Sequence, residues 1–341
     1  MTSNSSSSLP YVSLCTATFN RRPFIPALIK CILAQDYPRD RMEWIIVDDG
    51  TDKIHDVVKE LPFVKYFPID DKMSLGQKRN YMNRKANGSI LVYMDDDDYY
   101  PPTRVSHAVT KLLQHPNALC AGSSTMHIYF PTLQKMYRFG PYGPNHATAA
   151  TFAFRKTLLK QTRFEHDAAI AEEKGFLKNY TIPFVQLDPK HSILVIAHAH
   201  NSFDKHRLLD NLNPKYTALV PDAPEDFISD PALLKFYVED VHKQLVDYAP
   251  GRPNMKPDVI KQMVAIETSR RKIVEQAQAQ AQHSQPVIAY STTPDGPVVN
   301  MTLEQVCQLL SKQQEEIIQL KRLLQGKDTE IAYLQSMQKT T

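Results

Sequence analysis

Short apolar runs alternate with stretches of helical spacing over the first 115 residues. Runs at 11–18, 43–47, 64–69 and 90–94 have the length and composition of buried strands. Between and after them, four stretches are predicted as helices: 24–33, where apolar residues recur at helical spacing, 53–60, the basic stretch 75–85, and 103–115. Strands that are continuously apolar are typical of parallel sheets buried on both faces. The alternation predicts an α/β fold with a mostly parallel sheet flanked by helices.

Beyond residue 118 the pattern becomes irregular. Strand candidates occur at 119–130, 134–139, 148–155 and 184–196, and a helix is predicted over 169–178. Asp230 and Pro231 are an N-cap and N1 pair for a helix that reaches about residue 248. One domain is therefore predicted over 10–250, after a Ser-rich, disordered tail at 1–9.

The last 90 residues predict an extension. Residues 251–300 predict a helix followed by a Pro-rich linker, and Thr302 with Gln305 forms a capping box. Apolar residues then recur every seven positions at Leu303, Leu310, Ile317, Leu324 and Ile331. This spacing predicts a coiled coil over 301–338 that joins copies of the chain into a homo-oligomer. The alternative is one amphipathic helix docked on the main domain.

Composition excludes several functional classes. The net charge of +3 is too small to indicate a nucleic-acid-binding protein. The four cysteines form no CxxC pair, so neither a zinc knuckle nor a redox motif is supported. We expect a cytoplasmic protein, since the N-terminus lacks signal-peptide regions and no apolar run reaches the length of a membrane span.

Polar side chains follow the predicted strands where each strand ends. Thr16, Asn20 and Arg21 belong to the first strand end, Asp48 and Asp49 to the second, and Lys78 and Arg79 to the third helix. The run Asp95–Asp98 follows the fourth strand. Such ends meet at one edge of a parallel sheet. Carboxylates for a cation, together with Arg and Lys for phosphate, predict a nucleotide-diphosphate site there.

Four consecutive carboxylates need a compensating charge. If the run stays extended, Asp95 and Asp97 point to one side, while Asp96 and Asp98 point to the other. The Asp95-x-Asp97 pair then predicts a Mg²⁺ or Mn²⁺ site bridged to a substrate diphosphate. The alternative is a solvated acidic loop.

Segments 16–21, 45–52, 76–80 and 93–98 resemble the successive motifs of family 2 glycosyltransferases with the GT-A fold. The resemblance implies an inverting, metal-dependent enzyme of the hexosyltransferase class. Its donor would be a nucleotide sugar, with a UDP-sugar favoured, and its acceptor a carbohydrate or glycan. The implied nucleotide-binding residues are Thr16, Asn20, Arg21, Asp48, Asp49, Lys78, Arg79, Asp95 and Asp96.

The resemblance also implies a catalytic base and further metal ligands. Glu173 is the favoured base, with Glu172 as the second candidate, and acidic decoration of a helix start is the alternative. His198 or His200 would join Asp95 and Asp97 in binding the metal.

Two other functions fit parts of this pattern. A nucleotidyltransferase acting on sugar phosphates also places carboxylates and a metal on such a sheet, but the segment 16–23 contains no glycine for a phosphate loop. A non-catalytic oligomeric scaffold is the other, and the intact acidic residues argue against it.

Overall fold

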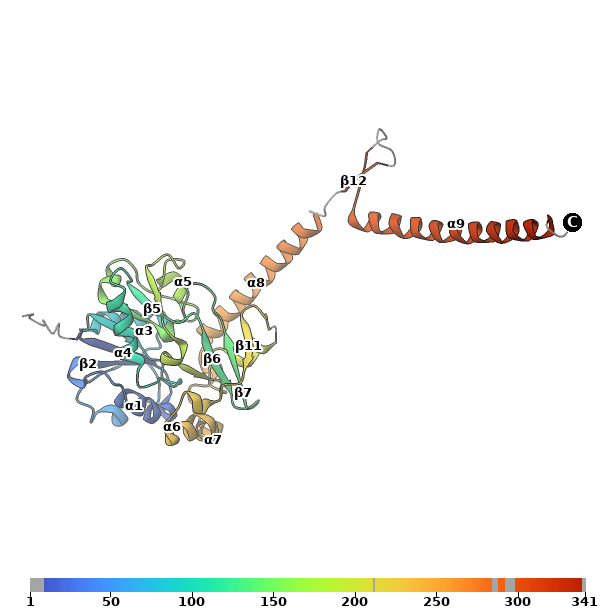
Figure 1. The fold of residues 1–341 in the computed structure, drawn as a ribbon. Helices are drawn as coiled ribbons and strands as arrows, with labels where there is room; N and C mark the ends of the chain where they lie inside the picture. The colour runs from blue at the N-terminus through green and yellow to red at the C-terminus, as the bar shows by residue number, and fades with distance from the viewer. Residues whose placement is uncertain (1–8, 211, 284–287, 292–297, 339–341) are drawn as a thin grey trace, which may run out of the picture. The chain divides into compact units, whose positions relative to one another are not determined.

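The structure is a computed structural model that describes residues 9–210, 212–283, 288–291 and 298–338. The described residues form two compact units, which divide between Ala265 and Ile266 (Figure 1). The first unit therefore extends past the predicted boundary at 250. Each unit is described by itself below.

A seven-stranded sheet in the order β3-β2-β1-β4-β8-β5-β9 is the centre of the first unit. Strands β1 to β4 are parallel, as predicted, whereas β8 runs antiparallel to both of its neighbours. The mixed α/β fold with a helix-flanked central sheet is thus confirmed. The strands are β1 (Val12–Thr18), β2 (Met42–Asp48), β3 (Val64–Pro68), β4 (Ile90–Tyr93), β5 (Cys120–Gly122), β8 (Ala153–Arg155) and β9 (Phe184–Gln186).

Successive residues of the central strands enter opposite apolar clusters, as the side-chain alternation of a strand requires. Trp44 and Ile46 of β2 pack in one cluster, and Ile45 and Val47 in the other. Helices α1 and α4 contribute to the first cluster, and α3 and α5 to the second, so both faces are covered. The helices of this unit are α1 (Ile25–Leu33), α2 (His55–Val58), α3 (Leu75–Lys85), α4 (Arg104–Gln114), α5 (Glu173–Phe176), α6 (Pro231–Lys235) and α7 (Val241–Asp247).

A second sheet in the order β10-β6-β7-β11 packs beside the first. Its strands are β6 (Met126–Phe130), β7 (Lys135–Phe139), β10 (Leu194–Ile196) and β11 (Thr217–Val220). An isolated antiparallel bridge links Tyr99, just after the Asp95–Asp98 run, to Leu194 of β10. The backbone amide of each residue donates to the carbonyl of the other, at 3.1 and 2.9 Å. This bridge places the start of β10 next to the segment that follows β4.

Several predicted elements are divided or shortened. The predicted strands 119–130 and 184–196 are each two strands that lie in different sheets, so the chain must turn between them. The predicted helix 169–178 is reduced to α5. Its extension is blocked because Lys178, Asn179 and Tyr180 all have positive φ angles. The predicted helix up to 248 is α6 and α7 joined by a π-helical turn, η8 (Phe236–Asp240).

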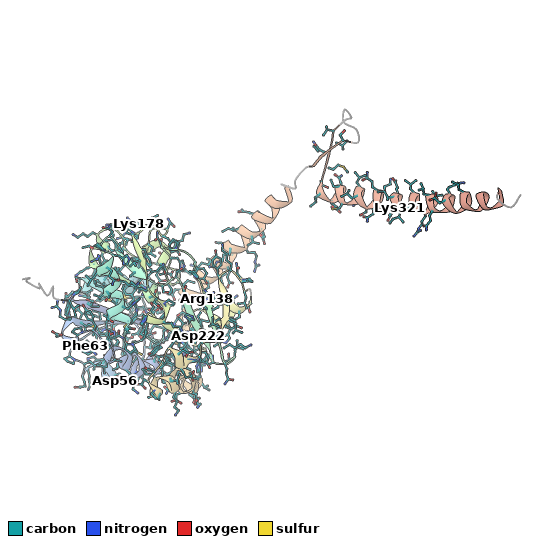
Figure 2. The ribbon with its side chains drawn as sticks, in the orientation of Figure 1. Asp56, Phe63, Arg138, Lys178, Asp222 and Lys321 are labelled. Atoms are coloured by element: carbon teal, nitrogen blue, oxygen red, sulfur yellow. The ribbon has the colours of Figure 1, made fainter. Side chains whose placement is uncertain are left out.

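The second unit carries the C-terminal elements. Helix α8 (Pro257–His283) begins in the first unit, and β12 (Ile288–Tyr290) and β13 (Val299–Met301) form an antiparallel pair before α9 (Leu303–Gln338). The predicted seam is exposed on α9: Leu310 is 57% and Leu324 67% exposed. Figure 2 shows the side chains that project from α9, among them Lys321. No helix in the described part of the chain is long and apolar enough to cross a membrane.

Candidate active site

Helix α3 presents two cations to the carboxyl edge of the sheet. Ser74 and Gln77 form a reciprocal capping box that fixes its first turn. Lys78 Nζ donates to Asp49 Oδ1 at 2.8 Å, and Arg79 Nε donates to Glu172 Oε1 at 2.8 Å. These contacts bring together four of the residues predicted for nucleotide binding or catalysis.

The Asp95–Asp98 run leaves β4 in a bend. Because residues 96–98 are not extended, strict alternation does not hold. Asp96 Oδ1 lies 3.5 Å from Arg21 Nε, and Asp97 Oδ2 lies 3.3 Å from Nη2 of the same guanidinium. Asp95 Oδ1 instead lies 3.6 Å from Arg79 Nη2. Burial and the adjacent Asp97 carboxylate raise the pKa of Asp96 to about 7.

Asp97 and His198 form a close pair at the junction of the two sheets. His198 Nε2 lies 3.2 Å from Asp97 Oδ2 and 2.8 Å from Asn201 Nδ2. Burial lowers the pKa of His198 to about 4, so the imidazole is neutral at pH 7. Burial alone would raise the pKa of Asp97, but Arg21 and His198 hold it well below its usual range. The pair thus presents an ionised carboxylate beside a neutral ring.

The four residues predicted as metal ligands do not converge. His200 lies in a turn at 199–200 rather than in an extended segment, and the centroid of its ring is 6.0 Å from that of Tyr248. Among the residues that the structure describes, no three or more His, Cys, Asp or Glu side chains are arranged to hold a metal ion. The Asp97 carboxylate and the His198 imidazole are nevertheless close enough together that both could bind one divalent cation, with phosphate or water oxygens as its other ligands.

The residues predicted after β1 and β2 mainly hold the loops in place. Thr16 Oγ1 accepts the Trp44 indole N–H at 2.9 Å and donates to the Met94 carbonyl at 2.8 Å, so its side chain does not reach the cavity. The Asp48 carboxylate accepts hydrogen bonds from Gly50, Ile54 and Tyr66. Asn20 has a φ of 54°, and its Oδ1 accepts from the Asp52 amide at 2.9 Å.

The two candidate bases differ in their partners. Glu172 is buried against Arg79, as described above. Glu173, the first residue of α5, forms no ion pair among the described residues. Burial and the Glu172 carboxylate raise the pKa of Glu173 to about 7, against the opposing effects of the Ala149 backbone amide and Arg79.

A segment beyond the predicted domain boundary completes the site. Residues 251–262, hereafter the 251–262 segment, bring Lys256 and Asp258 to the same cavity as Arg21, Arg79 and Asp97. Burial lowers the pKa of Lys256 to about 7. No motif marks this lysine; the only signal in the sequence is Pro257, which predicts a helix start immediately after it.

The cavity at this edge has a volume of about 130 Å³. Its walls carry five cations, which are Arg21, Lys72, Lys78, Arg79 and Lys256, and four carboxylates, which are Asp95, Asp96, Asp97 and Asp258. A larger surface cavity, of about 920 Å³, lies between the opposite face of α3 and residues 159–167, and it contains none of the predicted site residues. We therefore assign the chemistry to the smaller, more highly charged cavity.

Comparison with known proteins gives one family match. Residues 13–175 match the model of glycosyl transferase family 2. The chain is 24% identical over 108 residues to the poly(ribitol-phosphate) β-N-acetylglucosaminyltransferase TarS of Staphylococcus aureus. The aligned region covers 30% of this chain and 19% of TarS. It is 29% identical over 101 residues to the UDP-Glc:α-D-GlcNAc-diphosphoundecaprenol β-1,3-glucosyltransferase WfaP of Escherichia coli, or 29% of this chain and 39% of WfaP.

The chain was also compared with solved structures, among them a mannosyltransferase from Pyrobaculum calidifontis in complex with GDP-Man and Mn²⁺. It is 17% identical, with a TM-score of 0.47, over 82% of each chain. The chain spans well under two thirds of the length of the two sequence relatives.

Proposed function

We propose that the protein transfers a sugar from a nucleoside-diphosphate sugar to an acceptor hydroxyl, because residues 13–175 match the model of glycosyl transferase family 2. The transfer proceeds with inversion and with the help of a divalent cation. The observation that carries the proposal is the convergence of Arg79 and Lys78 with Asp95, Asp96 and Asp97 in one cavity. A site of this composition is suited to a diphosphate and its counter-cation.

The size of the cavity limits what it holds. Its 130 Å³ is below the ~300 Å³ at which whole ligand pockets begin. It therefore suits the diphosphate portion of a donor, while the nucleoside and the sugar extend beyond it. The nucleoside end adjoins the loops after β1 and β2, where Asn20 and Asp49 lie. A UDP-sugar is the favoured donor, since WfaP, to which the chain is similar, is a UDP-Glc:α-D-GlcNAc-diphosphoundecaprenol β-1,3-glucosyltransferase.

Asp97 and His198 would hold the cation, Mn²⁺ or Mg²⁺. When bound, it would neutralise negative charge on the departing nucleoside diphosphate. Arg79 supplies a fixed positive charge near the same place, because Glu172 and Asp95 hold its guanidinium in position. Arg21 keeps Asp97 ionised and so keeps it available as a ligand.

Glu173 is the proposed general base. Its carboxylate takes the proton of the acceptor hydroxyl as the acceptor oxygen bonds to the anomeric carbon. The bond from that carbon to the phosphate oxygen breaks, and its electron pair leaves with the diphosphate. A base with a pKa of about 7 is half ionised at neutral pH. Glu172 is less suited to this role, because its carboxylate is committed to Arg79.

Helix α9 would join copies of the chain. Its seam residues recur every seven positions and are exposed in a single copy; Leu303, Leu310, Ile317 and Ile331 are 50–57% exposed. A second copy of the same helix has the spacing needed to bury them. The predicted homo-oligomer is therefore retained as part of the proposal.

The test is a panel of nucleotide sugars, incubated with the protein and candidate glycan acceptors, with and without Mn²⁺. The expected result is cation-dependent release of nucleoside diphosphate that is lost in Asp97→Ala, with an inverted anomeric configuration by NMR. Absence of binding to every nucleotide sugar would refute the proposal. Release of pyrophosphate from a nucleoside triphosphate and a sugar phosphate would favour a nucleotidyltransferase instead.

A further inference from the structure

Lys256 is the one cation of the cavity, among the described residues lining it, that contacts no carboxylate. It is 6% exposed, and its ammonium donates to Ser202 Oγ at 2.7 Å. The other four cations have acidic partners. The nitrogen–oxygen distances of these ion pairs are 3.3 Å for Arg21 and Asp97, 3.7 Å for Lys72 and Asp258, 2.8 Å for Lys78 and Asp49, and 2.8 Å for Arg79 and Glu172.

The 251–262 segment that carries Lys256 is anchored on two sides of the site. Gly251 has a φ of +78°, and a Cβ there would lie 2.3 Å from the Asn20 carbonyl oxygen, so the backbones touch. Farther along, Gln262 Oε1 accepts from the Ala169 amide at 2.8 Å, close to the loop that leads into Glu172 and Glu173. Lys256 lies between these anchors, which limits how far its ammonium can move.

We propose that Lys256 binds the diphosphate of the nucleotide-sugar donor. The inference rests on the proposed function and adds a phosphate ligand from outside the region that matches the family model. An ammonium has three donors, and the single contact with Ser202 uses one. Buried polar groups are nearly always hydrogen bonded, and phosphate oxygens are strong acceptors for charged donors. Lys256 also stabilises the negative charge that grows on the diphosphate as it leaves.

The test compares Lys256→Met with Lys261→Met by calorimetric titration; Lys261 is a matched control because it is an exposed lysine of α8, the helix that begins directly after Lys256. The probes are UDP, GDP and ADP with Mn²⁺, and then the nucleoside of whichever binds tightest. We expect Lys256→Met to weaken nucleoside-diphosphate binding about 10- to 100-fold, as for one charged hydrogen bond. Binding of the nucleoside alone should not change, and Lys261→Met should match the wild type.

Equal nucleoside-diphosphate affinity in Lys256→Met and wild type would overturn the inference and leave the proposed function intact. If the wild type binds none of the three diphosphates, the proposed function fails as well. A second measurement uses the wild type alone, so it does not depend on a variant that folds. Acetylation followed by mass spectrometry should show that the bound diphosphate protects Lys256 and not Lys261. Equal labelling of Lys256 with and without the diphosphate contradicts the assignment.

Discussion

Replacing Glu173 by Gln should reduce activity and raise stability in alkaline solution. As the proposed general base, Glu173 would account for about 100- to 10,000-fold in rate, because Gln cannot accept the proton. The pKa of this carboxyl rises from 4.5 to about 7 in the folded protein. At about 1.4 kcal/mol per pKa unit, the free energy of unfolding falls by about 3 kcal/mol as the pH rises from 4.5 to about 7, because the buried carboxyl must then carry a charge.

The sign follows from the raised pKa. The folded protein retains the proton between pH 4.5 and about 7, so the favourable contribution of Glu173 is complete below 4.5 and lost above about 7. Gln is neutral throughout, so the variant and the wild type should be equally stable in acid. The variant should be more stable above pH 7, by up to about 3 kcal/mol.

Two assays test this reasoning together. Initial rates of nucleoside-diphosphate release between pH 5.5 and 9 should rise through about 7 in the wild type, and this rise should vanish in Glu173→Gln. Urea unfolding at pH 5 and pH 8 measures the stability difference. Glu172→Gln is the matched control: it should weaken donor binding by freeing Arg79, and it should keep the rise with pH but move it to lower pH, because the Glu172 charge no longer raises the pKa of Glu173. If Glu172→Gln loses the rise and Glu173→Gln keeps it, the assignment of the base is wrong.

Three further outcomes are expected. Asp97→Ala should weaken Mn²⁺ binding by more than about 10-fold in a titration followed by electron paramagnetic resonance, and unchanged affinity would contradict the cation site. Gly76→Ala should destabilise the first unit by about 1–3 kcal/mol, since the new Cβ would lie 1.9 Å from a backbone carbonyl oxygen. Gly326→Ala on α9 is the control and should not be destabilising, because nothing lies within 4 Å of its Cβ position. Leu310→Glu with Leu324→Glu should convert an oligomer to a monomer in light scattering, and a monomeric wild type would refute the coiled coil.

The central sheet could be predicted because its signal is local. Each of the first four strands is a short, mostly apolar run, and the 75–85 helix prediction matches α3 at both ends. The family resemblance carried by those segments is confirmed by the family match over residues 13–175. The mixed sheet was harder to predict, because the antiparallel β8 is only three residues long and carries no period of its own.

The site was predictable by residue type and less so by contact. The sequence brings Arg79, Asp97 and His198 into consideration, and the structure places all three at one edge. The sequence could not show that Arg21 contacts both Asp96 and Asp97, since these contacts depend on the bend after β4. Lys256 was missed because it is about 160 residues beyond the Asp95–Asp98 run and carries no motif.

The backbone bridge between Tyr99 and Leu194 makes the Asp97–His198 pair a product of late folding steps. The pair joins residues about 100 positions apart, and it forms only when the second sheet has docked on the first in the correct register. Contacts of such separation form slowly, because a long loop must close first. A cation that binds this pair would favour the docked arrangement by mass action. Its binding rate during refolding would then report when the two sheets come together.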